Sequence, residues 1–288
     1  MAFRLILSNL GKINQDIFNR TREIASGKKL HQPGQDPAAS ARVVRIRSEL
    51  SRINQYERNL QRSQVLLGSA DQAFNTLRNI LDTAIERTGF ALGGIANQGS
   101  LDTIATEIDQ IQQSVLRLAN TSVDGRNIFS GTQTQTQPFQ LVAGTYVYQG
   151  DAQPLQVEIA RGKTIQLTVS GDTVFTEPST DLLNSLTQLA DALRAGDLTT
   201  AEAMMVRLAD SGGVIDTARV QLSESMKQVD SVGQELANSM LTLIQELSSL
   251  EDADLAESII ALTGAETRLQ AALQVGARQR ASLFDLIG

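Results

Sequence analysis

Apolar residues recur at intervals of three and four through most of the first 132 residues, which is the spacing of one face of an α-helix. Pro33 and Gly34 interrupt this pattern, so we expect the first helix to end shortly before them. The pattern resumes at Asp36, whose side chain can cap a helix that starts with Pro37. The apolar stripe of this second helix consists of Val43, Ile46, Leu50, Ile53, Leu60, Leu67, Phe74, Leu77 and Leu81.

A glycine-bearing stretch from residue 89 to residue 99 separates the second helix from a third, for which Ser100 is the candidate cap. The apolar residues of the third helix are spaced four, three, four and three apart, which is the seam period of a coiled coil. These residues are Ile104, Ile108, Ile111, Val115 and Leu118. The third helix is therefore predicted to pack lengthwise against another helix.

Residues 133–180 follow a different pattern, in which apolar and polar residues alternate with a period of two. The pattern predicts strands at residues 155–159 and 165–169, joined by a short turn at residues 161–163. A third strand is expected at residues 146–148, which read Tyr, Val and Tyr. This segment is a small β insert, too short for a large domain.

The helical period then returns and continues to the end of the chain. A short amphipathic helix should close at Gly196, and Thr199 with Glu202 fits a capping box at the start of the next helix. Gly212 and Gly213 either end or bend that helix, and the sequence leaves this choice open. The strongest apolar run of the chain follows and consists of Leu222, Met226, Val229, Leu236, Met240, Leu243, Leu247 and Leu250.

These patterns predict a mainly α fold. We expect long, paired, coiled-coil-like helices from the N- and C-terminal regions to form a rod, with a small β-rich insert at about residues 135–178. As domains, we expect a terminal helical assembly region of residues 1–32 plus 253–288 and a helical rod of residues 33–132 plus 181–252. The β insert would take up residues 133–180.

Composition narrows the classes of function. Aromatic residues make up 4% of the chain and Trp is absent, which favours helices packed through narrow aliphatic seams. The net charge is −7, from 25 basic and 32 acidic residues, so a nucleic-acid partner is not expected. The apolar stretches are too short to insert into a membrane, and no cleavable signal peptide is recognised at the start.

Candidate chemistry is sparse. The chain has no Cys and one His, which excludes disulfides, Cys/His zinc sites and thiol nucleophiles. His31 has no second His or Cys to act with, so we interpret it as a solvated loop residue. The acidic residues Glu251, Asp252, Asp254 and Glu257 are interpreted as favourable charges at a helix start. We expect no enzyme activity, no metal and no cofactor.

The two ends of the chain carry apolar stripes on helices that are marginal in isolation. The residues of these stripes are Leu10, Ile13, Ile17, Ile24, Leu255, Ile259, Leu262, Leu269 and Leu273. Either the two helices pack on each other and finish the core, or they form an incomplete bundle that neighbouring copies must bury. Arg20 and Glu266 occupy positions in these stripes, where we expect them to set register rather than to add stability.

Three separated segments, in matching order, resemble the flagellin superfamily of axial filament proteins. Residues 24–39 contain the Ser-Gly-Lys and Asp-Pro-x-Ala steps, residues 124–139 contain Gly-Arg-x-Ile-Phe-Ser-Gly before Pro-Phe, and residues 251–257 read Glu-Asp-Ala-Asp-Leu-Ala-Glu. Within the superfamily the chain is most similar to the FlgL-type hook-associated proteins. The motif residues that carry the resemblance include Gly27, Lys28, Pro33, Asp36, Pro37, Ile128, Phe129, Gly131, Asp252 and Leu255.

The resemblance implies a structural protein of the bacterial flagellum that joins a hook-side junction protein to the filament. It implies as partners the first hook–filament junction protein, flagellin, neighbouring copies in a ring, the flagellar type III export apparatus and an export chaperone. The protein would act outside the cell, and its terminal stripes would order only when a neighbouring copy covers them. The nine stripe residues would then form the contact between subunits.

Two alternatives remain at this point. A flagellin-like filament subunit would polymerise on its own into long filaments. A cytosolic coiled-coil scaffold, which binds partner helices, would have ordered termini in the isolated monomer.

Overall fold

The computed structural model describes residues 2–30, 34, 36–93, 97–176 and 181–284, with the side chains of residues 2, 3, 5, 6 and 278–284 left out. His31 and the motif residue Pro33 lie outside the described residues. The chain divides into two compact units. The first unit combines residues 1–52 with residues 238–288, and the second unit consists of residues 53–237.

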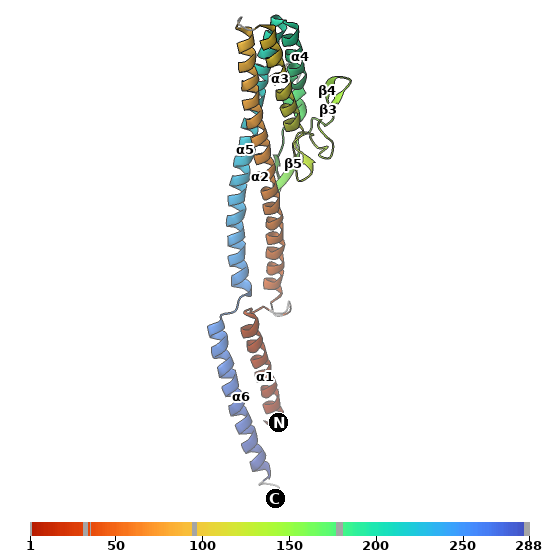
Figure 1. Ribbon diagram of the computed structural model, residues 1–288. Helices are drawn as coiled ribbons and strands as arrows, with labels where there is room; N and C mark the ends of the chain where they lie inside the picture. The colour runs from red at the N-terminus through yellow and green to blue at the C-terminus, as the bar shows by residue number, and fades with distance from the viewer. Residues whose placement is uncertain (1, 31–33, 35, 94–96, 177–180, 285–288) are drawn as a thin grey trace. The chain divides into compact units, whose positions relative to one another are not determined.

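The first unit contains the two terminal helices, α1 (Ala2–Ser26) and α6 (Leu255–Phe284). It also contains the first turns of α2 (Pro37–Leu92) and the last turns of α5 (Leu198–Glu251). Helices α1 and α6 lie side by side and run in opposite directions (Figure 1).

The second unit contains the rest of α2 and α5, together with α3 (Gln98–Ala119) and α4 (Leu182–Ala195), which pack side by side. Asp71 of α2 pairs with Arg219 of α5 at 3.0 Å. Most of the apolar stripe predicted for α2 is buried, from Val43 and Ile46 in the first unit to Leu77 and Leu81 in the second. The mainly α fold with long packed helices is confirmed.

Two helix ends follow the sequence closely. The Asp36 carboxylate accepts a hydrogen bond from the backbone N–H of Ala39 at 2.9 Å, and α2 begins at Pro37, as predicted. Helix α4 closes at Gly196, whose φ of 69° places it in the left-handed region that glycine tolerates.

Other expectations about helix ends were wrong. Asn97, and not Ser100, caps α3, because its side chain accepts a hydrogen bond from the Ser100 N–H at 2.9 Å. Asp197 similarly caps α5 through the Thr200 N–H, so the capping box of Thr199 with Glu202 is not the start of that helix. Gly212 and Gly213 do not end α5, which continues to Glu251.

The helical pattern also stops earlier than residue 132. Helix α3 ends at Ala119, and a tight hairpin of β1 (Ser122–Val123) and β2 (Arg126–Asn127) follows. Asp124 and Gly125 both have positive φ, of 50° and 73°, which turns the chain sharply. The amide of Asn120 then bonds the backbone of Phe139 in both directions, and so holds the following segment against the end of α3.

The β insert consists of two further antiparallel hairpins. Strands β5 (Gln156–Ala160) and β6 (Lys163–Gln166) pair as predicted, around a turn at Gly162 with φ of 70°. Strand β4 (Thr145–Tyr148) was predicted, whereas its partner β3 (Phe139–Val142) was missed. A short π-helical turn, η1 (Asp172–Thr176), leads from the insert towards α4.

Phenylalanine rings hold the insert on the helices of the second unit. The ring centroids of Phe74 and Phe129 are 5.2 Å apart, and those of Phe129 and Phe175 are 5.5 Å apart. Phe139 lies 5.2 Å from both Phe175 and Tyr148. All four phenylalanines are nearly inaccessible to solvent, so this cluster is the core of the insert.

The motif residue Gly131 lies where the chain passes close to itself. Its φ is 66°, and a Cβ there would lie 2.1 Å from the Asp151 carboxylate and 2.3 Å from the Asp151 carbonyl oxygen. No part of the described structure forms a helix that is both long and apolar enough to cross a bilayer.

We expect Gly131→Ala to destabilise the second unit, because the new Cβ has no space beside Asp151. Gly162→Ala is the matched control, since Gly162 has a similar φ but nothing within 4 Å of a Cβ. Urea unfolding should show a loss for Gly131→Ala that exceeds that of the control by about 2 kcal/mol or more. Equal losses would show that backbone strain alone matters at both sites.

Candidate assembly surface

Helices α1 and α6, which we call the terminal pair, are held together without a conventional core. Asp16 pairs with Arg268 at 3.3 Å, and the Ser258 hydroxyl donates to the Glu23 carboxylate, also at 3.3 Å. Among their described side chains, only Ser258 and Ala265 are buried, and both are small. The terminal pair therefore buries little apolar surface between its own two helices.

None of the nine stripe residues is buried in this structure. The half-buried ones are Leu10, Ile13, Ile17, Ile24, Leu262 and Leu269. Leu255, Ile259 and Leu273 are 47%, 52% and 55% exposed. The structure thus brings the six half-buried residues into the neighbourhood of the α1–α6 contact and leaves the other three facing outwards.

Helix geometry explains this division. Ser258, Leu262, Ala265 and Leu269 are spaced four, three and four apart and form the inner face of α6. Ile259 lies one position beyond Ser258, and Leu273 lies one beyond residue 272, the next position of the series, so each is rotated by about 100° from it. Leu255 continues the series and is exposed because it is the first residue of α6. The stripe inferred from the sequence therefore joined two faces of α6.

The two polar stripe residues also separate. Arg20 is half-buried and pairs with Glu23 at 2.9 Å within α1. Glu266 is exposed, because it lies one position beyond the buried Ala265 and so on the outer face of α6. Its role in setting register stays a prediction.

Further apolar side chains extend the outer surface of the terminal pair. Phe18 of α1 is 60% exposed, and Ile260 of α6 is 73% exposed. Sequence reasoning missed both residues, because neither fits the three-and-four spacing of its helix. Large exposed apolar residues on both helices indicate a surface that another chain can cover.

Beside the terminal pair, the two linkers that lead into it are tied together. The Lys29 N–H donates to the Glu251 carbonyl at 2.7 Å, and the Ala253 N–H donates to the Gly27 carbonyl at 2.9 Å. These bonds form an antiparallel bridge between Lys28 and Asp252. Gly27, with φ of 68°, ends α1 and turns the chain into this bridge.

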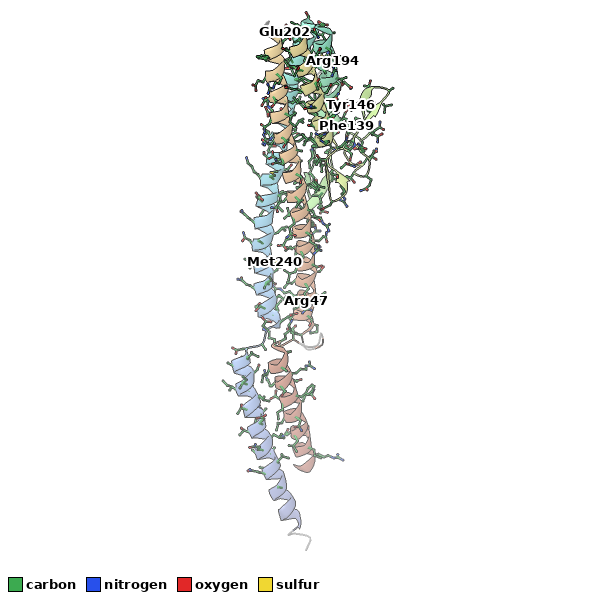
Figure 2. All side chains as sticks on the ribbon, in the orientation of Figure 1. Arg47, Phe139, Tyr146, Arg194, Glu202 and Met240 are labelled. Carbon is green, nitrogen blue, oxygen red and sulfur yellow. The ribbon has the colours of Figure 1, made fainter. Side chains whose placement is uncertain are left out.

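A charge cluster, which we call the clasp, covers the bridge. The Glu251 carboxylate is 2.6 Å from Lys28 Nζ and 2.7 Å from Arg47 Nη2 (Figure 2 labels Arg47). Its side chain is 6% exposed, whereas those of Lys28 and Arg47 are 43% and 57% exposed. One buried anion is thus shared by two cations that reach water.

The electrostatics of the clasp favour the ionised carboxylate. Burial by itself raises the pKa of Glu251, but hydrogen bonds and charge from Lys28 and Arg47 outweigh it and leave the pKa below its ordinary value.

Lys29 makes a further contact beside the clasp. Its Nζ donates to the Ser249 carbonyl in the last turn of α5 at 2.7 Å, where a cation is favourable.

The acidic residues at positions 251–257 therefore have different roles. Asp254 caps α6, as its carboxylate accepts hydrogen bonds from the N–H groups of Ala256 and Glu257 at 2.9 and 3.1 Å. Glu251, however, is the last residue of α5, so its interpretation as a charge at a helix start was wrong. Its partner Lys28 lies 223 positions away, and no periodicity in the sequence links the two.

Asp36 and Pro37 form the start of α2, and the other described motif residues lie at two places. Gly27, Lys28 and Asp252 lie at the bridge, and Leu255 begins α6 directly beyond it. Ile128 and Phe129 are buried in the second unit, next to the tight passage at Gly131.

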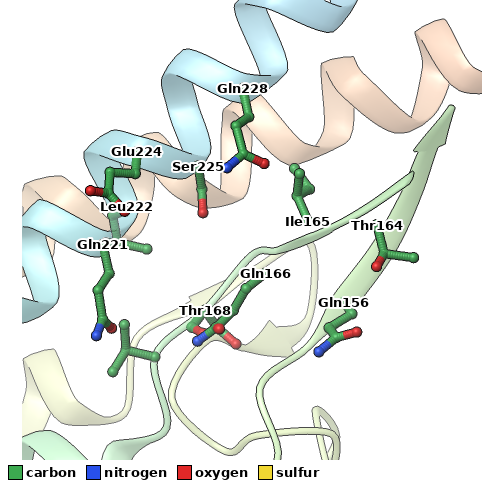
Figure 3. A pocket seen from close by; sticks show the side chains of 11 residues that line it. Gln156, Thr164, Ile165, Gln166, Thr168, Gln221, Leu222, Glu224, Ser225 and Gln228 are labelled. Carbon is green, nitrogen blue, oxygen red and sulfur yellow. The ribbon is translucent and has the colours of Figure 1, made fainter. Parts of the chain in front are cut away.

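A polar groove of about 420 Å³ lies between β6 and α5 in the second unit (Figure 3). Its lining includes the amide side chains of Gln156, Gln166, Gln221 and Gln228, together with the apolar side chain of Ile165. Glu224 is its one ionisable lining residue, so the groove presents no acid–base pair. Within the described parts of the chain, no group of His, Cys, Asp and Glu is arranged to hold a metal ion.

The clasp should weaken in acid. A carboxylate whose pKa is lowered on folding adds stability above its unfolded pKa, and this stability is lost as pH falls through the folded pKa. We expect the side-chain carboxyl ¹³C signal of Glu251 to titrate below about pH 4.3, the ordinary value for Glu. Protection of the Lys29 and Ala253 amides should fall over the same interval. Titration at or above the ordinary value would contradict the geometry of the clasp.

Ala265 should be intolerant of a larger side chain, because it is fully buried between the terminal helices. We expect Ala265→Leu to cost about 1–3 kcal/mol in the pairing of α1 with α6. Ala271→Leu is the control, since Ala271 is exposed on the same helix. Amide exchange in α1 measures the effect, and equal exchange in the two variants would count against close packing at Ala265.

Comparison with known proteins agrees with the motifs. The family described as bacterial flagellin N-terminal helical region matches residues 2–134. Flagellar hook-associated protein 3 of Escherichia coli K12 is 25% identical over 92% of this chain and 90% of its own length. The protein of the same name from Salmonella typhimurium LT2 is 24% identical over 87% of this chain and 80% of its own length.

Solved structures share the fold. FlgL from Xanthomonas campestris, at 17% identity, superposes with a TM-score of 0.65 over 70% of this chain and 99% of its own. FlgL from Bacillus cereus, at 22% identity, superposes with a TM-score of 0.62 over 71% of this chain and 99% of its own. These structures show a shared fold, and the match to the family and to the two hook-associated proteins confirms the resemblance inferred from the three sequence segments.

Proposed function

Because this chain carries a flagellin-type N-terminal helical region and resembles the FlgL-type hook-associated proteins along most of its length, we propose that it is a structural protein of the bacterial flagellum. It acts as an adaptor at the junction between hook and filament. It performs no catalysis in this role and needs no cofactor.

The terminal pair is the observation that carries this proposal. Its two helices leave Leu255, Ile259 and Leu273 about half exposed, and its buried positions hold only Ser258 and Ala265. A helix pair of this kind is marginal alone, because most helical stability comes from packing an apolar face. A neighbouring copy that covers the exposed face supplies the missing burial, so that the terminal pair becomes fully ordered as it assembles.

The form of the assembly depends on the geometry of the contact between subunits. A head-to-tail contact between different faces of identical subunits produces rings or helical arrays. We propose that residues 1–32 and 253–288 form the inner assembly region of this array. Residues 33–132 and 181–252 would form the helical layer next to it, and the β insert at residues 133–180 would face outwards.

The proposed partners are those of a junction protein. On the hook side the chain would contact a first junction protein, on the filament side flagellin, and within its own layer neighbouring copies of itself. It would reach this place outside the cell through the flagellar type III export apparatus, with an export chaperone covering its exposed apolar termini until assembly.

Substitutions on the outer face of α6 test the proposal. Ile259→Asp places a charge on the proposed contact, which should cost about 3 kcal/mol or more per contact when the contact is buried. The control is Val220→Asp on α5, because Val220 is 60% exposed and lies outside the assembly region. In a strain that lacks the native chain, electron microscopy should show at least about tenfold fewer filament-bearing hooks with Ile259→Asp and normal numbers with Val220→Asp. Normal junctions with both variants would refute the proposed contact.

A flagellin-like filament subunit is the second candidate, since the family that matches residues 2–134 is named for flagellin. The two candidates differ in what the purified protein does alone. A filament subunit forms long homopolymers when seeded with its own fragments, whereas a junction protein remains monomeric without hook ends. Sedimentation and electron microscopy of the seeded protein distinguish them.

A further inference from the structure

The proposed function leaves the clasp unexplained. Buried carboxylates are rare in proteins unless they are paired, because taking a charge out of water is costly. Glu251 is only 5% exposed, although a carboxylate beside these linkers could instead point into solvent. Because burial of a charge is costly, we expect Glu251 to have a specific role where the chain enters the terminal pair.

The clasp joins three segments of the first unit. Lys28 follows the end of α1, Arg47 lies in the early turns of α2, and Glu251 ends α5. The bridge between Lys28 and Asp252 ties the chain leaving α1 to the chain entering α6. Nearby, Arg42 of α2 also pairs with Glu246 of α5 at 2.6 Å, so a second ion pair joins the same two helices.

Glu251 is the centre of this arrangement. Lys28 and Arg47 are each about half exposed and can turn to water when the carboxylate is removed. The buried carboxylate cannot turn to water in the same way. When Lys28 or Arg47 alone is removed, the carboxylate keeps the other cation as a partner. Loss of the Glu251 carboxylate therefore opens both ion pairs, whereas loss of Lys28 opens one.

We propose that Glu251 is a positioning residue for assembly, which fixes the end of α1 beside the start of α6 so that both terminal helices present their outer faces to a neighbouring copy together. This inference rests on the proposed junction function. The clasp also limits fraying, because any loosening of α1 and α6 stops at the bridge and does not continue into α2 and α5.

Amide exchange on the full-length chain tests the clasp itself. Glu251→Gln keeps the shape of the side chain and removes its charge. Glu49→Gln is the control, since it makes the same substitution at an exposed position of α2 in the same unit, outside the bridge. We expect exchange at residues 27–30 and 251–254 to rise about tenfold or more with Glu251→Gln, equivalent to about 1.4 kcal/mol, and to stay within about twofold with Glu49→Gln. Exchange at residues 222–236 should not change.

Lys28→Gln keeps the test decisive should Glu251→Gln fold poorly. It removes one exposed partner and should raise exchange in the same linkers by a smaller factor. The double variant should exchange no faster than Glu251→Gln alone, because both changes open the same contact. Additive effects, or unchanged linkers in both single variants, would overturn the clasp.

Assembly is then measured with the same variants. We expect Glu251→Gln to reduce filament-bearing hooks as Ile259→Asp does, and Glu49→Gln to leave them normal. Loosened linkers with normal junctions would overturn the positioning role while leaving the junction function intact. Failure of the junction function has a separate signature, because hooks would then carry filaments even without this chain.

Discussion

Burial of apolar surface on the terminal helices controls the rest of the behaviour of this chain. Two helices that meet through Ser258 and Ala265 approach closely but gain little hydrophobic free energy, since small side chains remove little apolar area from water. In the proposed assembly, small residues inside and large ones outside would leave the free energy of burial to be gained from a neighbouring subunit, which would link ordering and assembly thermodynamically.

Such a linkage requires that the loose part and the stable part meet at a defined boundary. The clasp forms this boundary through ion pairs rather than through apolar packing. Ion pairs suit the linkers because these segments are short. An apolar cluster large enough to hold the linkers would need bulk that these short segments lack, whereas one carboxylate with two cations needs only three side chains. The desolvation of Glu251 is offset by short bonds to Lys28 and Arg47, and both cations keep contact with water.

Much of the fold could be predicted from the sequence, because its determinants are local. The cap at Asp36, the left-handed end at Gly196 and the hairpin at Gly162 depend on residues within a few positions of one another. The candidate assembly surface and the clasp were harder to predict from the sequence. Periodicity located the terminal stripes but could not separate inner from outer faces of α6, since Leu262 and Ile259 differ only by rotation about the helix. The clasp was missed because Lys28 and Glu251 are far apart in sequence, and the motif similarity marked both linkers without indicating that they touch.

The distribution of aromatic residues gives the division between the two units a physical basis. Phe74, Phe129, Phe139 and Phe175 are all buried together in the second unit, where each ring contacts at least one other. In the terminal pair, the described phenylalanine, Phe18, is instead 60% exposed. Large rings contribute more burial per residue than aliphatic chains, so a chain with few of them can complete only a limited core. By placing these four rings in the second unit, the sequence gives that unit an aromatic core and leaves the stability of the terminal helices dependent on what they contact. In the proposed adaptor, the second unit would keep this core while the terminal helices join neighbouring copies.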